Sequence, residues 1–253
     1  MDILDRFIGQ ARINVDSGYY DLGRQTSYRR LSLRKSLESR DFSLIAEIKH
    51  RSPVGEYSFI DIDAKKASLD FRDAGADAIS VVVEPAIFRG TLANVAAARS
   101  AGIPVLFKDF VISRLQIVSA ERSGADAVLL IARVFDRLEI SPKVMIDYCH
   151  SLGLEVLLEC YDEGEMERAA QTDADLLGIN SRDLRTLKVD IGRAAGILKR
   201  VKSEKPIVSE SGIRTGNDAM LLRQSGAKGI LVGTAIWTAQ DMRAKIMELK
   251  GLR

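Results

Sequence analysis

The chain has 253 residues, of which 46% are hydrophobic and 28% are charged. This composition excludes a disordered, collagen-like or low-complexity protein. The 37 Lys and Arg residues nearly balance the 35 Asp and Glu residues, which leaves a net charge of +2. Because no strong field favours nucleic acid or an anionic membrane, we expect neither as a partner and predict a small-molecule ligand instead. The length fits either two ordinary domains or one large α/β barrel.

Residues 1–42 precede the repeating part of the chain and form a predicted helical extension. Ile3, Leu4, Phe7 and Ile8 fall on one helical face, which predicts a first helix. A second helix is predicted over residues 28–39. Two roles stay open for this extension, namely a cap on the domain that follows and a cover that shapes a ligand site.

From residue 43 onward, short apolar runs alternate with segments of helical periodicity, eight times in all. The runs are rich in Val, Ile and Leu and are bounded by turn residues, which is typical of buried parallel strands. The predicted strands are 43–50, 78–84, 104–110, 127–133, 155–160, 176–182, 206–211 and 229–233.

The segments between these strands predict helices, several of which end at a glycine that leads directly into the next strand. Residues 75–79, 124–128 and 226–230 share this arrangement, and glycine accepts the left-handed conformation that ends many helices. Eight such units predict an α/β fold, a closed (β/α)8 TIM barrel over residues 43–253 that follows the extension of residues 1–42. An open doubly wound sheet is the alternative, but its first strand commonly leads into a glycine-rich turn.

Charged and polar residues gather at the carboxyl ends of the predicted strands, where barrel enzymes carry their active sites. Glu47 and Lys49 lie two residues apart, and therefore on one face of the first strand. An unpaired charge inside an apolar strand is costly, so we expect the lysines and glutamates to pair in one pocket suited to acid-base chemistry. The residues of this kind on later strands are Lys108, Glu159, Asn180, Arg182 and Glu210.

Two small turns follow the last two strands. Ser211 and Gly212 follow the seventh strand, and Gly233 and Thr234 follow the eighth. Barrel enzymes often bind phosphate at these positions, where glycine lets backbone N–H groups approach an anion. The two turns together predict a phosphorylated ligand.

Cysteine and histidine content argues against structural metal or disulfide bonds. Cys149 and Cys160 have neither disulfide-framework nor zinc-type spacing, so we expect reduced, buried thiols in a cytoplasmic protein. His50 and His150 are the only histidines, and we predict no metal site. No apolar run reaches the length of a signal peptide or a membrane span.

With these residues the chain resembles the indole-3-glycerol phosphate synthases, in the family's order and spacing from residue 45 to 236. The resemblance implies a cofactor-free carboxy-lyase of tryptophan biosynthesis. Its substrate would be 1-(2-carboxyphenylamino)-1-deoxyribulose 5-phosphate, which loses CO2 and water to give indole-3-glycerol phosphate. The matching segments are IAEIKHRSP (45–53), EPAIFRG (84–90), FKDF (107–110), VLLIAR (128–133), GLEVLLE (153–159), GINSRDLRTL (178–187), VSESGI (208–213) and LVGTAI (231–236).

The same resemblance implies roles for individual residues. Lys108 would be the general acid that protonates the ribulose carbonyl, and Glu159 a second catalytic carboxylate. Glu47 and Lys49 match a pair implicated in ring closure and dehydration. Asn180 and Glu210 match positions that hold hydroxyl groups and lysines. The residues matching substrate-binding positions are Phe110 and Leu129 around the aromatic ring, Ser211, Gly212, Gly233 and Thr234 at the phosphate, and Ser52 and Arg182 nearby.

The chain departs from the family pattern in a few places. Val83 stands where the family commonly has Thr or Ser before the glutamate of the second strand, and Thr91 stands where it commonly has Ser. His50 and Glu56 make the loop after the first strand more polar and acidic than the lysine-rich loop expected for the family. Glu84 is assigned no catalytic role. Whether the extension touches substrate is left open by the sequence.

We expect the protein to be a monomer. Three other functions stay open. A Schiff-base aldolase would use Lys49 or Lys108 as a nucleophile of lowered pKa. Phosphoribosylanthranilate isomerase would use a related barrel but would carry a cysteine at the end of the first strand. A non-enzymatic binder of phosphorylated ligands would bind without turnover.

Overall fold

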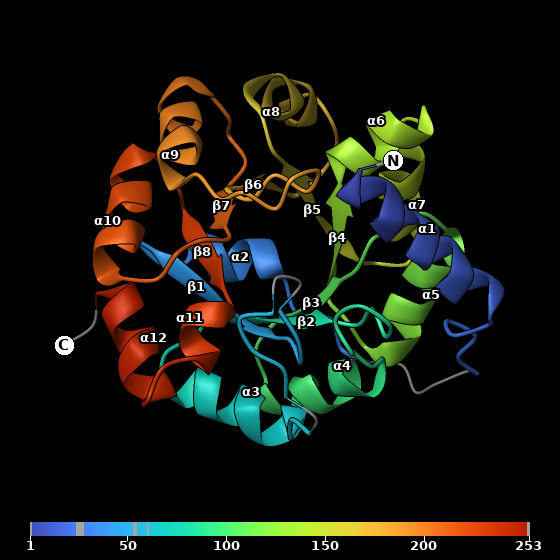
Figure 1. The fold of residues 1–253 in the computed structure, drawn as a ribbon, viewed down its shortest axis with the longest axis horizontal. Coiled ribbons are helices and arrows are strands. Elements are labelled where there is room, and N and C mark those ends of the chain that lie inside the picture. The colour runs from blue at the N-terminus through green and yellow to red at the C-terminus, as the bar shows by residue number, and fades with distance from the viewer. Residues whose placement is uncertain (1, 24–27, 53–54, 60, 252–253) are drawn as a thin grey trace.

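The computed structural model describes residues 2–23, 28–52, 55–59 and 61–251. Within this part of the chain, eight parallel strands close into a barrel in which each strand pairs with its sequence neighbours and β8 pairs with β1 (Figure 1). The predicted (β/α)8 barrel is therefore confirmed, and the open sheet is excluded. The strands are β1 Ser43–Ile48, β2 Ala78–Val82, β3 Val105–Lys108, β4 Ala127–Ile131, β5 Glu155–Cys160, β6 Leu176–Asn180, β7 Ile207–Glu210 and β8 Gly229–Val232.

Helices surround the barrel and cover the outer faces of the strands (Figure 1). The predicted glycine ends are present, since Gly124 (φ 90°) and Gly226 (φ 115°) end their helices in the left-handed conformation. The surrounding helices are α3 Ala64–Asp73, α4 Ala93–Ala98, α5 Arg114–Ser123, α6 Ala132–Leu138, α7 Lys143–Ser151, α8 Glu163–Ala170, α9 Ile191–Arg200, α10 Gly216–Ser225, α11 Thr234–Trp237 and α12 Met242–Lys250.

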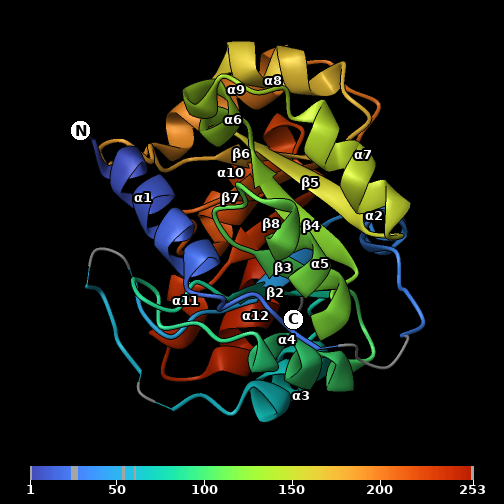
Figure 2. The same cartoon turned by 90° about the vertical axis from the view of Figure 1, so that its right-hand side faces the viewer.

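The extension contributes one helix to each end of the barrel. Helix α1 (Ile3–Asp16) and helix α2 (Leu33–Glu38) lie at opposite ends in Figure 2. The buried face predicted for the first helix is confirmed by Leu4, Phe7 and Ile8. The extension therefore places one helix at each mouth of the barrel.

The second predicted helix is shorter than expected. Helicity begins only at Leu33, because the preceding residues are held extended against the barrel. The Leu31 amide donates to Asp126 over 2.9 Å, and the Ser32 side chain then caps the helix. The prediction of a helix over residues 28–39 was therefore wrong for residues 28–32 and for Ser39, the helix C-cap.

Side chains inside the barrel form an apolar layer beneath a charged one. Successive residues of a strand point to opposite faces, so Ile45, Glu47 and Lys49 all point inward. The same change from apolar to charged occurs on β3, from Leu106 to Lys108. Leu157 and Val208 complete the apolar layer on β5 and β7. We call the four residues Ile45, Leu106, Leu157 and Val208 the barrel floor.

At the amino ends of the strands, three aspartates repeat one contact. Each aspartate directly precedes an even-numbered strand and accepts a hydrogen bond from a backbone amide near the start of the preceding odd-numbered strand. The amides of Leu44, Val105 and Val156 donate to Asp77 (2.9 Å), Asp126 (2.9 Å) and Asp175 (2.8 Å), respectively. These hydrogen bonds hold neighbouring strands in register and contribute to the stability of the fold.

Candidate active site

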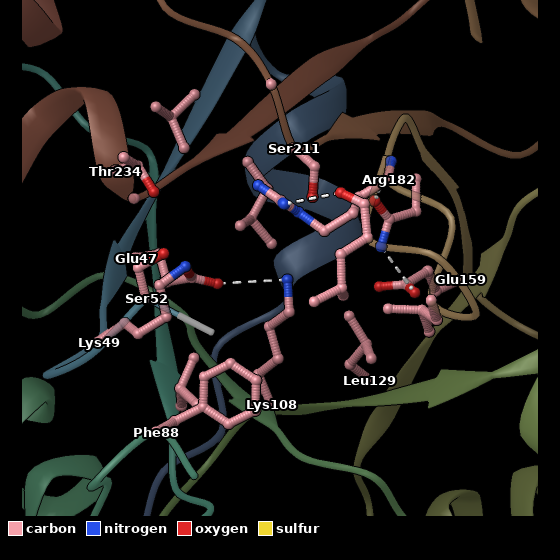
Figure 3. Close-up of a pocket in the computed structure, with 18 of the residues that line it drawn as sticks. Glu47, Lys49, Ser52, Phe88, Lys108, Leu129, Glu159, Arg182, Ser211 and Thr234 are labelled. Carbon is pink, nitrogen blue, oxygen red and sulfur yellow. Dashed lines mark hydrogen bonds and ion pairs between the residues drawn. The ribbon is translucent and has the colours of Figure 1, made fainter. Parts of the chain in front are cut away.

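A cavity of about 290 Å³ opens at the carboxyl ends of the strands (Figure 3). Every predicted site residue except Glu210 lines it. Glu210 is fully buried and lies behind Lys108. The predicted residues on the cavity wall are Glu47, Lys49, Ser52, Lys108, Phe110, Leu129, Glu159, Asn180, Arg182, Ser211, Gly212, Gly233 and Thr234.

Glu47 joins the two lysines of the cavity. Its carboxylate lies 2.7 Å from the Lys49 Nζ and 3.2 Å from the Lys108 Nζ. The Lys108 ammonium also donates to Glu210 over 2.8 Å. The predicted pairing of buried lysines with glutamates is therefore confirmed for Glu47 and Glu210, which hold the Lys108 ammonium from two sides. Figure 3 shows the contact between Lys108 and Glu47.

This pairing determines which groups are charged. Burial opposes ionisation of Glu47, but the charges of Lys49 and Lys108 outweigh it and lower the pKa of Glu47 to about 2. Burial also disfavours the Lys108 ammonium, but Glu210, Glu47 and Glu159 outweigh it and raise the Lys108 pKa. Lys108 is consequently a cation at neutral pH and can act as a proton donor, whereas a nucleophilic amine needs a lowered pKa.

Glu159 has the opposite electrostatic environment. Burial and the nearby charge of Glu210 raise its pKa to about 8, against the opposing influence of Lys108. The Asn180 amide donates to the Glu159 carboxyl over 2.9 Å. Asn180 in turn accepts the backbone amide of Arg182 at 2.9 Å. The raised pKa keeps Glu159 mainly protonated at neutral pH, and a side chain from the next strand holds it in place.

Two glycines make room for the carboxylates. A Cβ atom at Gly233 would lie 2.6 Å from the Glu47 Oε1, and one at Gly178 would lie 2.7 Å from the Glu210 Oε1. Both distances are too short for a real contact, so any larger residue would displace the acid beside it. Gly233 was predicted only as a phosphate-site residue, and Gly178 was not singled out.

The two predicted phosphate-site turns lie at the same end of the cavity. Ser211 and Thr234 both lie in the upper part of Figure 3, on the other side of the cavity from Phe88. Ser211 (φ 66°) and Gly212 (φ 76°) both adopt the left-handed conformation. A Cβ atom at Gly212 would come within 2.3 Å of the Val189 side chain, so only glycine fits this turn.

The acidic residue of the first loop also reaches this end. Glu56 accepts a hydrogen bond from the Ser52 hydroxyl at 3.1 Å and forms an ion pair with Arg214 at 2.7 Å. Arg214 follows the turn after β7. Glu56, which departs from the family pattern, therefore links the loop after β1 to the loop after β7.

An aromatic wall of three phenylalanines faces the other end of the cavity. Phe7 and Phe110 stack with ring centroids 4.6 Å apart, and Phe88 lies 6.0 Å from Phe7 and 6.3 Å from Phe110. Only Phe110 was predicted to line the site. Phe7 was predicted to lie on the buried face of α1, and Phe88 lies within the matched segment EPAIFRG. The extension therefore contributes a side chain to the cavity.

Other features of the described residues are simpler. Cys149 and Cys160 are buried and unbonded, and burial raises the pKa of Cys149 to about 12. The described residues contain no cluster of three or more His, Cys, Asp or Glu side chains arranged to hold a metal ion. No described helix has the length and apolarity needed to cross a bilayer.

Comparison with known proteins decides the family. The profile of indole-3-glycerol phosphate synthase matches residues 10–249. The indole-3-glycerol phosphate synthase of Bacillus cereus is 34% identical over 251 residues, which cover 98% of each chain. That of Campylobacter fetus is 33% identical over 258 residues, which cover 98% of this chain and 99% of its own.

The chain belongs to the indole-3-glycerol phosphate synthase family. It is accordingly a carboxy-lyase of tryptophan biosynthesis. The expected family membership is confirmed, and the alternative assignments to an aldolase, to phosphoribosylanthranilate isomerase and to a non-enzymatic binder are set aside.

More distant structures share only the fold of this synthase. A 3-hexulose-6-phosphate synthase superposes with a TM-score of 0.65 at 17% identity, covering 83% of this chain and 98% of its own. Thiamine phosphate pyrophosphorylase from Pyrococcus furiosus gives 0.61 at 21% identity, covering 87% and 96%. Barrels of different activity thus share this framework, and the side chains of the cavity distinguish them.

Proposed function

We propose that the chain converts 1-(2-carboxyphenylamino)-1-deoxyribulose 5-phosphate into indole-3-glycerol phosphate, CO2 and water. One observation carries this proposal. A buried lysine ammonium, Lys108, and a neutral carboxylic acid, Glu159, face one cavity between an aromatic wall and two small phosphate-type turns. The site therefore offers two proton donors to a substrate with an aromatic ring at one end and a phosphate at the other.

Substrate placement follows from the two ends of the cavity. The phosphate lies against the turns of Ser211, Gly212, Gly233 and Thr234, whose small residues allow backbone N–H groups to approach an anion. The carboxyphenyl ring lies against the aromatic wall and Leu129. This orientation places the ribulose carbonyl near Lys108, in the middle of the cavity.

Ring closure uses the Lys108 ammonium. The ring carbon that carries the carboxylate attacks the ribulose carbonyl carbon, and Lys108 donates a proton to the carbonyl oxygen. Glu47 and Glu210 hold the ammonium in position for this transfer. A positioned general acid typically contributes a factor of about 10² to 10⁴ in rate. CO2 then leaves, and its bonding electrons restore the aromatic ring.

Dehydration uses the two donors in sequence. Glu159 donates a proton to the departing hydroxyl group, which leaves as water. The Lys108 amine, neutral since ring closure, takes a proton from the carbon next to nitrogen and becomes an ammonium again. Glu159 is reprotonated from solvent, so each turnover consumes one proton, as the loss of a carboxylate as CO2 requires. Asn180 orients Glu159, while Lys49, Arg182 and Ser52 contact the polar groups of the substrate.

A substrate assay tests this proposal. Purified protein mixed with the carboxyphenylamino-deoxyribulose phosphate should produce the fluorescence of an indole and release one CO2 per product. Folded protein that binds the substrate without forming an indole would overturn the proposed reaction.

We also propose that the protein works as a monomer in the cytoplasm. Both ends of the cavity and all the proposed catalytic groups come from one chain, so a second subunit is not needed to complete the site. Sedimentation of the active protein at the mass of one chain, 27.9 kDa, supports this proposal. Activity confined to a dimer would contradict it.

A further inference from the structure

The carboxylate of Glu84 lies beside the aromatic wall and has no role in the proposed reaction. Its side chain is 1% exposed. It accepts four hydrogen bonds from N–H groups, two at each oxygen. Oε1 accepts from the Ala86 amide (2.9 Å) and the Asn14 side chain (2.9 Å), and Oε2 from the amides of Ile87 (2.6 Å) and Phe88 (2.9 Å).

These contacts fix the segment that carries Phe88. Three consecutive backbone amides point at one carboxylate, so the chain after β2 must curl around the Glu84 side chain. The turn also packs tightly on the strand it leaves, since a Cβ atom at Gly90 would lie 2.2 Å from the Val82 carbonyl oxygen. The Gly90 amide donates to the Glu84 carbonyl oxygen at 2.8 Å. Phe88 therefore enters the cavity from a segment with little freedom to move.

The same carboxylate reaches the extension. Asn14 lies on α1, two helical turns after Phe7, and its side chain is buried against Glu84. Gln10 donates to the Asn14 oxygen at 2.9 Å and so orients the amide. One acid thus connects the two segments that supply Phe7 and Phe88 to the aromatic wall.

We propose that Glu84 is a positioning residue that sets the spacing of Phe7 and Phe88 and thereby the affinity of the site for the aromatic ring of the substrate. This inference rests on the proposed function, in which the carboxyphenyl ring occupies the aromatic wall. The turns at Ser211 and Thr234 lie at the far end of the cavity from Phe88 (Figure 3). Loss of Glu84 should therefore weaken ring binding and leave phosphate binding unchanged.

The substitution Glu84→Gln tests the role of the carboxylate at constant size. Both carboxylate oxygens accept N–H groups, so either orientation of the glutamine amide places an NH2 group against donors. We measure the binding of 2-aminobenzoate and of inorganic phosphate separately by calorimetry. The 2-aminobenzoate affinity should fall about tenfold, the equivalent of about 1.4 kcal/mol, and the phosphate affinity should change less than about twofold.

A matched control and a coupled variant separate positioning from loss of structure. Asp126→Asn alters another buried carboxylate that accepts backbone amides, at the opposite end of the barrel, and should leave both affinities unchanged. In a Phe88→Leu background, Glu84→Gln should cost less ring affinity than in the parent protein, because one of the two residues through which it acts is gone and only Phe7 remains.

The outcomes are distinct. If Glu84→Gln binds 2-aminobenzoate like the parent protein, or loses both ligands equally while folded, the positioning role is wrong. If Glu84→Gln fails to fold, Asn14→Ala removes only one of the four bonds and should lower ring affinity about threefold; an unchanged affinity then overturns the inference. A parent protein that binds both ligands but forms no indole would refute the proposed function while leaving the positioning role standing.

Discussion

The two ends of the barrel both bury carboxylates, but they give them different partners. At the amino end, Asp77, Asp126 and Asp175 accept backbone amides of neighbouring strands, and Asp77 and Asp126 also pair with Lys250 and Arg99, which do not line the cavity. At the carboxyl end, Glu47 and Glu210 accept the ammonium groups of lysines. Lys49 and Lys108 line the cavity, so their ammonium protons can reach a bound ligand, whereas the donors at the amino end lie outside it. The same residue type therefore stabilises the fold at one end and holds a proton donor at the other.

The comparison also distinguishes the carboxylates of the active site from one another. Glu47 lies between two cations and has a pKa lowered to about 2, while Glu159, buried near the charge of Glu210, has a pKa raised to about 8. Position on the same barrel end is thus not enough to assign a role. The partner within hydrogen-bonding distance decides whether a carboxyl group is an ionised acceptor that holds a lysine or a protonated group that donates a proton.

The largest effect is expected from Lys108→Met, which removes the proton donor and keeps most of the side-chain volume. The kcat for indole formation should fall by about 10² to 10⁴. The fluorescence assay measures this change, and calorimetry with 2-aminobenzoate should show nearly unchanged ring binding. A variant that turned over at the parent rate would mean that Lys108 is not the general acid.

A smaller effect, on stability alone, is expected at the amino end. Asp126→Ala removes the acceptor of the Val105 and Leu31 amides and the partner of Arg99 at 3.1 Å. Because one buried and one partly buried donor lose their acceptor, the free energy of unfolding should fall by about 2 to 4 kcal/mol. Urea denaturation measures it. The kcat at 25 °C should stay at the parent value. A large loss of kcat would contradict the assignment of stability to the amino end and catalysis to the carboxyl end.

The smallest effect is expected in the pH dependence of the reaction. Glu159 must be protonated to donate, so kcat should decline as the pH rises through about 8. In Glu159→Gln this step should disappear.

The raised pKa also has a stability consequence, because the folded state holds the proton more tightly than the unfolded chain. The stability that Glu159 contributes is complete below its ordinary pKa of 4.5 and is lost as the pH rises to about 8.

Denaturation of the parent and of Glu159→Gln across this pH range checks the sign. The parent should lose stability relative to the variant between about pH 4.5 and 8. A constant difference would show that Glu159 titrates alike in the folded and unfolded states, and the assigned donor role would then lose its physical basis.

Much of the fold and of the site was predictable because both depend on patterns within short segments of the sequence. Strand periodicity, helix-ending glycines and the charges at strand ends together predict a barrel and a polar cavity at its carboxyl end. The pairing of Glu47 with Lys49 follows from a spacing of two residues on one strand. The contacts between β1, β3 and β7 that join Glu47, Lys108 and Glu210 follow once the barrel closes.

The remainder depends on contacts between segments far apart in the sequence. Nothing local shows that Asn14 meets Glu84, 70 residues later, or that Phe7 reaches the cavity. The extended residues before Leu33 were predicted to be helical because their pairing with Asp126 is not visible in their own periodicity. The need for glycine at position 178 likewise comes from Glu210 on the next strand.

The barrel floor has a consequence for the order of events during turnover. Ile45, Leu106, Leu157 and Val208 are fully buried, and Leu33 and Leu37 of α2 pack beneath them. The cavity is therefore a well with its opening at one end. Substrate must enter, and CO2, water and the indole product must leave, past the same rim. A product molecule still in the well excludes the next substrate, so accumulated product should inhibit competitively with respect to substrate. The strength of this inhibition should depend on how slowly the product dissociates.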